Sequence, residues 1–136
     1  MANTLKLEII TPDAVVYSED VHMVTLESAE GQLGIYPMHI PLITQIVPGE
    51  LIVTKDGRDS HLAVGEGLAD ITADSVSIVT DMAIPADRID EAKVEEARQR
   101  AAARLQDKIS DEEVATINAS LARSLAQLKV KRRHHG

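Results

Sequence analysis

The fold is decided by the stretch EGQLGIYPMHIPL, residues Glu30–Leu42, in which glycine and proline recur at short intervals. Gly31 and Gly34 lie three residues apart, and Pro37 and Pro41 lie four apart. Glycine permits backbone angles and close approaches that other residues do not, whereas proline fixes φ and cannot donate a hydrogen bond to a neighbouring strand. The stretch therefore predicts a tightly specified corner between two β-strands.

Apolar and polar residues alternate on both sides of this corner as far as residue 83. The clearest runs are Leu5–Ile9, Val24–Leu26, Leu51–Val53 and Val76–Thr80. Period-two alternation predicts strands with one buried face. Turn signals that recur every ~8–12 residues favour an antiparallel sandwich or barrel over a parallel sheet. Asp56–Gly57 is the strongest of them and predicts a two-residue hairpin.

The hydrophobic period changes after Pro85, where a helical pattern begins. Asp90 is placed as the N-cap of a first helix, and Ser110 begins a capping box for a second. The sequence therefore predicts an all-β sandwich domain at residues 1–85. An α-helical antiparallel hairpin is predicted at residues 86–136, which makes the chain α+β overall, with two small domains.

The predicted hairpin is weakly packed, because alanine fills much of both helices and each alanine buries little apolar area. The same alanines favour helix formation. We therefore expect two stable helices whose mutual packing can open. The predicted connection is only Lys108 and Ile109, and the apolar stripe of the second helix is Ile117, Leu121, Leu125 and Leu128.

Composition narrows the classes of protein that fit. Of the 136 residues, 44% are hydrophobic, but Phe, Trp and Cys are absent, so the core must consist of aliphatic side chains. The lack of cysteine excludes disulfides and thiolate metal sites. No apolar run has the ~18 residues needed to cross a bilayer, and no signal peptide is recognisable. We therefore expect a soluble, cytoplasmic chain.

Charge is distributed unevenly. The net charge is −8, with 4 Lys/Arg against 14 Asp/Glu in residues 1–88 and 10 against 8 in residues 89–136. No acidic residue follows Glu113. The basic end has three interpretations: a solvated helix terminus, a nucleic-acid contact (weak, because no aromatic residue is interleaved), or a contact with an acidic protein. The cations concerned are Arg123, Lys129, Lys131, Arg132 and Arg133.

No pattern in the sequence indicates catalysis. His22, His39, His61, His134 and His135 lack metal-ligand spacing, and the glycine pairs lack the lysine of a phosphate loop. We therefore predict no catalytic residue and no metal site. A binding protein, such as a β-sandwich adaptor with a helical pair, is favoured over a small enzyme.

The opening stretch closely resembles the segment Glu-Gly-x-Leu-Gly-Ile-x-Pro-Gly-His-x-Pro-Leu of the ε subunit of the F-type (F1Fo) ATP synthase. The order of the two modules is also that of the ε subunit, and the chain is identified as a member of this family. Further matching segments occur in the family's order at Thr11–Asp13, Val21–Leu26, Pro48–Leu51, Gly65–Gly67, Val76–Val79 and Ile89–Asp90.

The resemblance implies a non-catalytic central-stalk subunit that couples proton-driven rotation to ATP synthesis. It implies a sandwich that binds the γ subunit and the c ring. It also implies a hairpin that extends along γ, places its basic residues against the acidic β subunits and inhibits ATP hydrolysis. The α and β subunits are thus expected partners, and nucleic acid is not. The implied location is the cytoplasmic face of the inner (plasma) membrane, with membrane attachment only through Fo.

Particular residues take roles from the same resemblance. Met38 stands where the family usually has glycine. Independently of the family, His39 is expected to form a hydrogen bond within the corner. The implied subunit interface is Gln32, Leu33, Ile35, Tyr36, Met38 and His39.

Some members of the family bind ATP on the folded hairpin through Ile-Asp-x-x-Arg-Ala and two arginines of the second helix. Ile89 and Asp90 match that pattern, but Lys93 replaces its arginine. Arg123 matches one arginine of the second helix, and Gln127 replaces the other. Lysine lacks the planar fork of arginine. We therefore expect ATP to bind weakly or not at all at Ile89, Asp90, Lys93 and Arg123, and no other cofactor.

Overall fold

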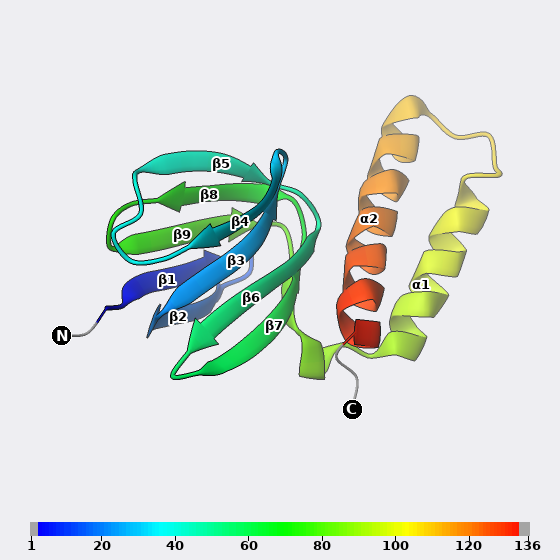
Figure 1. Cartoon of the computed structure of the whole chain (residues 1–136). Coiled ribbons are helices and arrows are strands. Elements are labelled where there is room, and N and C mark those ends of the chain that lie inside the picture. Colours follow the sequence, from blue (N-terminus) through cyan, green and yellow to red (C-terminus); the bar gives the residue numbers. More distant parts are fainter. Residues whose placement is uncertain (1–2, 134–136) are drawn as a thin grey trace.

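The computed structural model describes residues 3–133. Ten strands come first, and a short 3-10 turn and two helices follow (Figure 1). The strands are β1 (Leu5–Ile10), β2 (Val15–Val21), β3 (Met23–Ser28), β4 (Gly31–Ile35), β5 (Leu42–Ile46), β6 (Gly49–Lys55), β7 (Arg58–Val64), β8 (Gly67–Ile71), β9 (Ser75–Thr80) and β10 (Ala83–Pro85).

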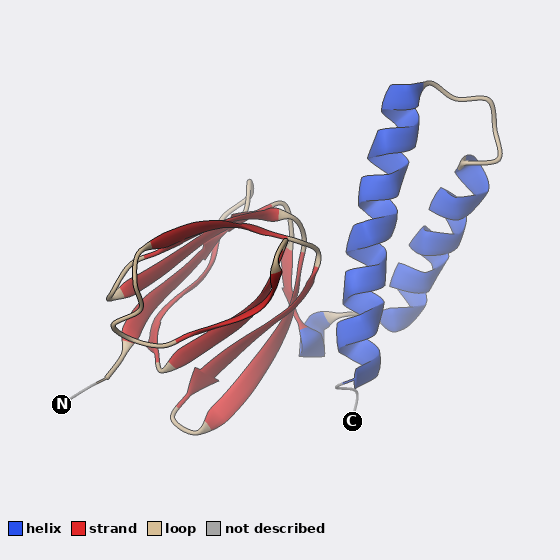
Figure 2. Cartoon of the chain, turned by 45° about the horizontal axis from the view of Figure 1, so that its top comes forward, coloured by secondary structure: helices blue, strands red, loops and turns tan. Residues whose placement is uncertain are grey.

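The strands form two layers. One layer runs β10-β7-β6-β3, with β4 also paired to β3, and the other runs β5-β8-β9-β1-β2. Neighbouring strands are antiparallel except β1 and β9, which are parallel. The layers join where Ser28 pairs with Ile46. Figure 2 shows the strands curving around a common interior, so the predicted β-sandwich is confirmed.

The core follows the alternation read from the sequence. Leu5, Leu7 and Ile9 of β1 point inward and are at most 2% exposed, whereas Lys6 between them is exposed. The buried side chains of the main core cluster are all aliphatic, and the half-buried Tyr17 packs against the cluster from one side. Since period-two strands place alternate residues on opposite faces, one aliphatic face per strand is enough to fill the sandwich.

The predicted hairpin at Asp56–Gly57 joins β6 to β7. Both residues have positive φ, 52° and 76°, which matches the twist of a two-residue hairpin turn. Lys55 pairs with Arg58 directly across the turn. The hairpin prediction is therefore confirmed together with its register.

The two helices begin at the predicted caps. Asp90 accepts a hydrogen bond from the Lys93 amide (3.2 Å) at the start of α1 (Glu91–Arg104). The Ser110 hydroxyl accepts one from the Glu113 amide (3.2 Å) before α2 (Asp111–Arg133). The predicted two-residue connection is wrong, because i→i+3 hydrogen bonds at residues 105–107 end α1 early and leave a loop at residues 105–110.

Helix α2 lies between the sandwich and α1 in both views (Figures 1 and 2), and it contacts β6 and β7. Ala126 and Val130 are buried in a small apolar cluster with Ala63, Met82 and Ile89. The predicted stripe is wrong at one position. Leu125 is exposed, because α2 turns one side to the sandwich as well as one to α1.

Candidate functional site: an apolar outer face and a basic helix

The predicted interface segment divides into buried and exposed parts. Ile35 is 0% exposed and belongs to the core, so its predicted place on a contact surface is wrong in this conformation. The end of β4 alternates, and Ile35 falls on its inward face. Leu33 packs partly against the core, and Gln32 is exposed. His39 is half-buried, and its Nδ1 lies 2.7 Å from the Ile40 carbonyl oxygen, within the corner as expected.

Met38 is the most constrained exposed residue of this corner. Its φ is 71°, in the left-handed region, and its side chain is 83% exposed. The Met38 amide donates to the Ala73 carbonyl oxygen (2.6 Å), which fastens the corner to the turn between β8 and β9. A methionine is strained here, because a Cβ is disfavoured at positive φ.

An apolar surface continues from this corner across the outer layer. Leu68 pairs directly with Val79, and Ile43 lies diagonally across from Leu68, on the same outward face. An open groove of about 530 Å³ lies along Leu68, Val79 and Ile10. We call this surface the outer apolar face. Its exposed members are Tyr36, Met38, Ile40, Ile43, Leu68 and Val79.

The basic residues of α2 are not free in this conformation. Arg123 forms an ion pair with Asp81 (3.2 Å), and Lys129 forms one with Glu27 (3.1 Å). Arg133 reaches the carboxylate of Glu50, which is buried in the sandwich (2.7 Å). Lys131 Nζ lies 3.4 Å from a backbone carbonyl oxygen of the 3-10 turn η1 (Ala86–Arg88). These cations therefore have partners within the fold, and those partners come from elements distant in sequence.

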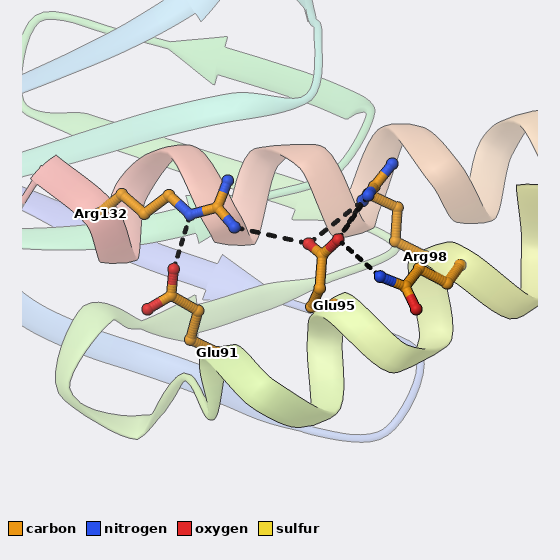
Figure 3. A network of polar contacts seen from close by, with 5 residues as sticks. Glu91, Glu95, Arg98 and Arg132 are labelled. Atoms are coloured by element: carbon orange, nitrogen blue, oxygen red, sulfur yellow. Dashed lines mark hydrogen bonds and ion pairs between the residues drawn. The ribbon is translucent and has the colours of Figure 1, made fainter.

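A second ionic network joins the two helices (Figure 3). Arg132 of α2 donates to Glu91 (2.6 Å) and to Glu95 (3.5 Å) of α1. Glu95 also accepts from Arg98 and from Gln99 of its own helix. The hydrogen bonds from Arg98 lower the pKa of the Glu95 carboxyl from its ordinary value. Arg132 thus joins the last turn of α2 to the first turns of α1.

The residues proposed for nucleotide binding have structural roles. Ile89 is buried, Asp90 caps α1, and Lys93 is exposed on its first turn. Arg123 is held by the sandwich, and Gln127 Nε2 donates to the Met82 sulfur (3.2 Å). Asp90, Arg123 and Gln127 therefore already have partners within the chain.

Within residues 3–133, no group of His, Asp or Glu is arranged to hold a metal ion. Neither helix is long and apolar enough to span a membrane. His134 and His135 lie outside the described residues.

The two modules each match a family model. Residues 4–86 match the β-sandwich domain of the ATP synthase Delta/Epsilon chain, and residues 87–132 match its long α-helix domain. Together the two models cover nearly the whole chain. The chain therefore belongs to the Delta/Epsilon chain family of ATP synthase.

Within the Delta/Epsilon chain family, the similar relatives are epsilon chains. The ATP synthase epsilon chain of Herpetosiphon aurantiacus is 40% identical over 126 residues, 93% of each chain. That of Laribacter hongkongensis is 33% identical over 139 residues, 98% of this chain and 99% of the relative. As an epsilon chain, the protein is a non-catalytic subunit of the central stalk of the F-type ATP synthase. The family identified from the sequence is thereby confirmed, and the alternative of an unrelated adaptor is excluded.

Two solved structures are similar. A chain of the Euglena gracilis mitochondrial ATP synthase, in a structure described as OSCP/F1/c-ring, has a TM-score of 0.74 and 25% identity, covering 98% of this chain and 84% of that one. A chain of the Tetrahymena thermophila mitochondrial enzyme, described as central stalk/c-ring, has a TM-score of 0.64 and 14% identity, covering 93% and 96%. The second likeness concerns the fold alone.

The strain at Met38 predicts that Met38→Gly stabilises the chain. A left-handed backbone costs an L-residue about 1–2 kcal/mol, and the greater freedom of glycine in the unfolded state offsets part of the gain. We expect the free energy of unfolding, measured by urea denaturation, to rise by about 0.5–1 kcal/mol. Asp56→Gly is the control and should gain less, because aspartate tolerates this region better. An equal or lower stability of Met38→Gly would mean that the corner is not strained.

Proposed function

We propose that the chain couples rotation by binding the γ subunit and the c ring through its outer apolar face, and that α2 regulates ATP hydrolysis. The observation that carries the first part is the exposure of large apolar side chains on adjoining strands and the preceding corner. Ile43, for example, is 70% exposed. Monomeric proteins rarely leave such side chains contiguous and uncovered, and where they do, the surface commonly serves as an interface.

The position of the outer apolar face supports the same partners. The corner between β4 and β5 lies at the end of the sandwich remote from the helices (Figure 1), so a partner there would not compete with α2. The similar chain from Euglena belongs to a structure described as containing F1 and the c-ring. From its membership of the family, we place the chain at the cytoplasmic face of the inner (plasma) membrane, held there by Fo.

The regulatory part rests on the charge of α2. Its last turns carry five cations and no carboxylate, and exposed charges of one sign steer association with an oppositely charged surface. In an extended hairpin, these cations would be available to acidic segments of the β subunits. In the folded hairpin, four of them are held by carboxylates of the same chain. The two states would therefore compete for the same side chains.

Nucleotide binding is not part of this proposal. Asp81 already occupies the guanidinium of Arg123, and neither Lys93 nor Gln127 offers a planar fork to a phosphate. Each charge-assisted hydrogen bond that is missing would weaken a site by about 1.5–3 kcal/mol. ATP would then bind in the millimolar range or not at all.

Assembly tests the interface. Ile43→Glu should weaken binding of the chain to a γ–c-ring complex about tenfold or more, because a charge would replace an apolar contact at a desolvated surface. The monomer should keep its stability, since the side chain already faces water. Leu125→Glu is a matched control, because Leu125 is also an exposed apolar residue but lies on α2. Surface plasmon resonance at constant salt measures both variants, and equal binding by Ile43→Glu and the unmodified chain would contradict the proposal.

Hydrolysis tests the regulation. Added to an αβγ complex, the unmodified chain should lower ATP hydrolysis, and the alanine variant of Arg123, Lys129, Lys131, Arg132 and Arg133 should lower it less. Raising the salt concentration should mimic the variant, because exposed charges are screened within about 8–10 Å at physiological ionic strength. The steady-state hydrolysis rate measures both effects. Equal inhibition by the variant, or none by the unmodified chain, would contradict a regulatory role of these cations.

A further inference from the structure

The side of the sandwich that faces α2 carries an acidic partner for three of the helix's cations. Asp81 receives Arg123 near the middle of α2, and Glu27 receives Lys129 farther along. Glu50 receives Arg133 at the last described residue. These ion pairs follow the helix over about three turns. The helix is therefore held to the sandwich at intervals along its second half.

Two of these carboxylates lie against glycines. A Cβ at Gly49 would be 1.9 Å from Glu27 Oε2, and a Cβ at Gly65 would be 1.8 Å from Asp81 Oδ1. Neither glycine has positive φ, so the backbone conformation does not require glycine at either place. Glycine is required at these two positions because the carboxylates of Glu27 and Asp81 occupy the space that a Cβ would fill. Any larger residue would push the carboxylate out of its position beneath α2.

The apolar contact between α2 and the sandwich is small by comparison. In the small apolar cluster between α2 and the sandwich, the buried side chains of α2 are Ala126 and Val130. The ion pairs beside them are only partly covered, since the side chains of Arg123 and Asp81 are 34% and 38% exposed. Partly exposed ion pairs are weakened by salt, whereas apolar contacts are not. The attachment of α2 therefore has a component that depends on ionic strength.

We propose that Glu27 and Asp81, seated on Gly49 and Gly65, form a latch that holds α2 on the sandwich and that opens as ionic strength rises. Opening releases Lys129 and Arg123 together, because both carboxylates belong to the sandwich and both cations belong to one helix. The latch is a property of the isolated chain and does not depend on any partner. If the proposed function also holds, an acidic partner would compete with the latch for the same cations.

The test follows the distance between α2 and the sandwich in the full chain. The sequence has no cysteine, so Ala73→Cys in the turn after β8 and Ala115→Cys on α2, both exposed, accept one spin label each. Double electron–electron resonance then separates a narrow attached population from a broad detached one. For the unmodified latch, the detached fraction should grow as the Debye length shrinks from about 30 Å at 0.01 M salt to about 3 Å at 1 M.

Two kinds of variant should open the latch. Glu27→Gln with Asp81→Asn removes both charges at constant size and should raise the detached-to-attached ratio at low salt about threefold to tenfold, the range expected for two partly exposed ion pairs. Its dependence on salt should become weaker. Gly49→Ala with Gly65→Ala keeps both charges but displaces the carboxylates, and it should raise the ratio in the same way. Circular dichroism verifies that the sandwich stays folded, and the glycine pair carries the test if the amide pair does not fold.

The control is Glu19→Gln with Asp59→Asn, which removes two carboxylates whose partners, Lys55 and Thr54, belong to the sandwich. This variant should behave like the unmodified latch. The proposal is overturned if the amide pair leaves the ratio unchanged, or if the control raises it equally. It is also overturned if Gly49→Ala with Gly65→Ala leaves the detached-to-attached ratio unchanged, because the two glycines would then have no role in holding α2.

Discussion

The structure depends first on the burial of alternate aliphatic side chains between the two layers of the sandwich. With no Phe or Trp, this core has only branched and short apolar residues, and interiors of that kind depend on close packing along the whole length of each strand. Once the inward residues are fixed, the outward ones are fixed too, because the side-chain period of a strand is two. The strand part of the outer apolar face, Ile43, Leu68 and Val79, is thus a consequence of the same register that builds the core.

The two modules are stabilised by different physics. The sandwich has a continuous apolar cluster of its own, whereas α1 buries no residue completely and α2 meets the sandwich through a few small side chains and several ion pairs. Salt does not weaken apolar burial, but it does weaken exposed ion pairs. This difference suits a central-stalk subunit in which we propose a permanent binding surface on one module and a movable regulator in the other.

Local patterns were enough to predict much of this fold. The alternation of Leu5, Leu7 and Ile9, the turn at Asp56–Gly57 and the cap at Asp90 all act between near neighbours, and all are confirmed. The glycines and prolines of residues 30–42 were also enough to predict a corner. They did not predict that Ile35 is buried, because its register is set by pairing with β3. The partners of the basic residues could not be predicted. Glu27 and Lys129 are 102 residues apart, and only the packing of α2 on β6 and β7 brings them together.

The claim that the sandwich is complete without its helices is tested most directly by urea unfolding of a fragment of residues 1–88. The fragment lacks Ile89, Ala126 and Val130 of the small apolar cluster, but it keeps every residue of the main core. It should unfold in one cooperative transition, with a free energy of unfolding within about 1–2 kcal/mol of that of the sandwich in the full chain. A fragment that is unfolded in water, or that loses most of this stability, would show that the sandwich needs the helical hairpin in order to fold and would contradict the account.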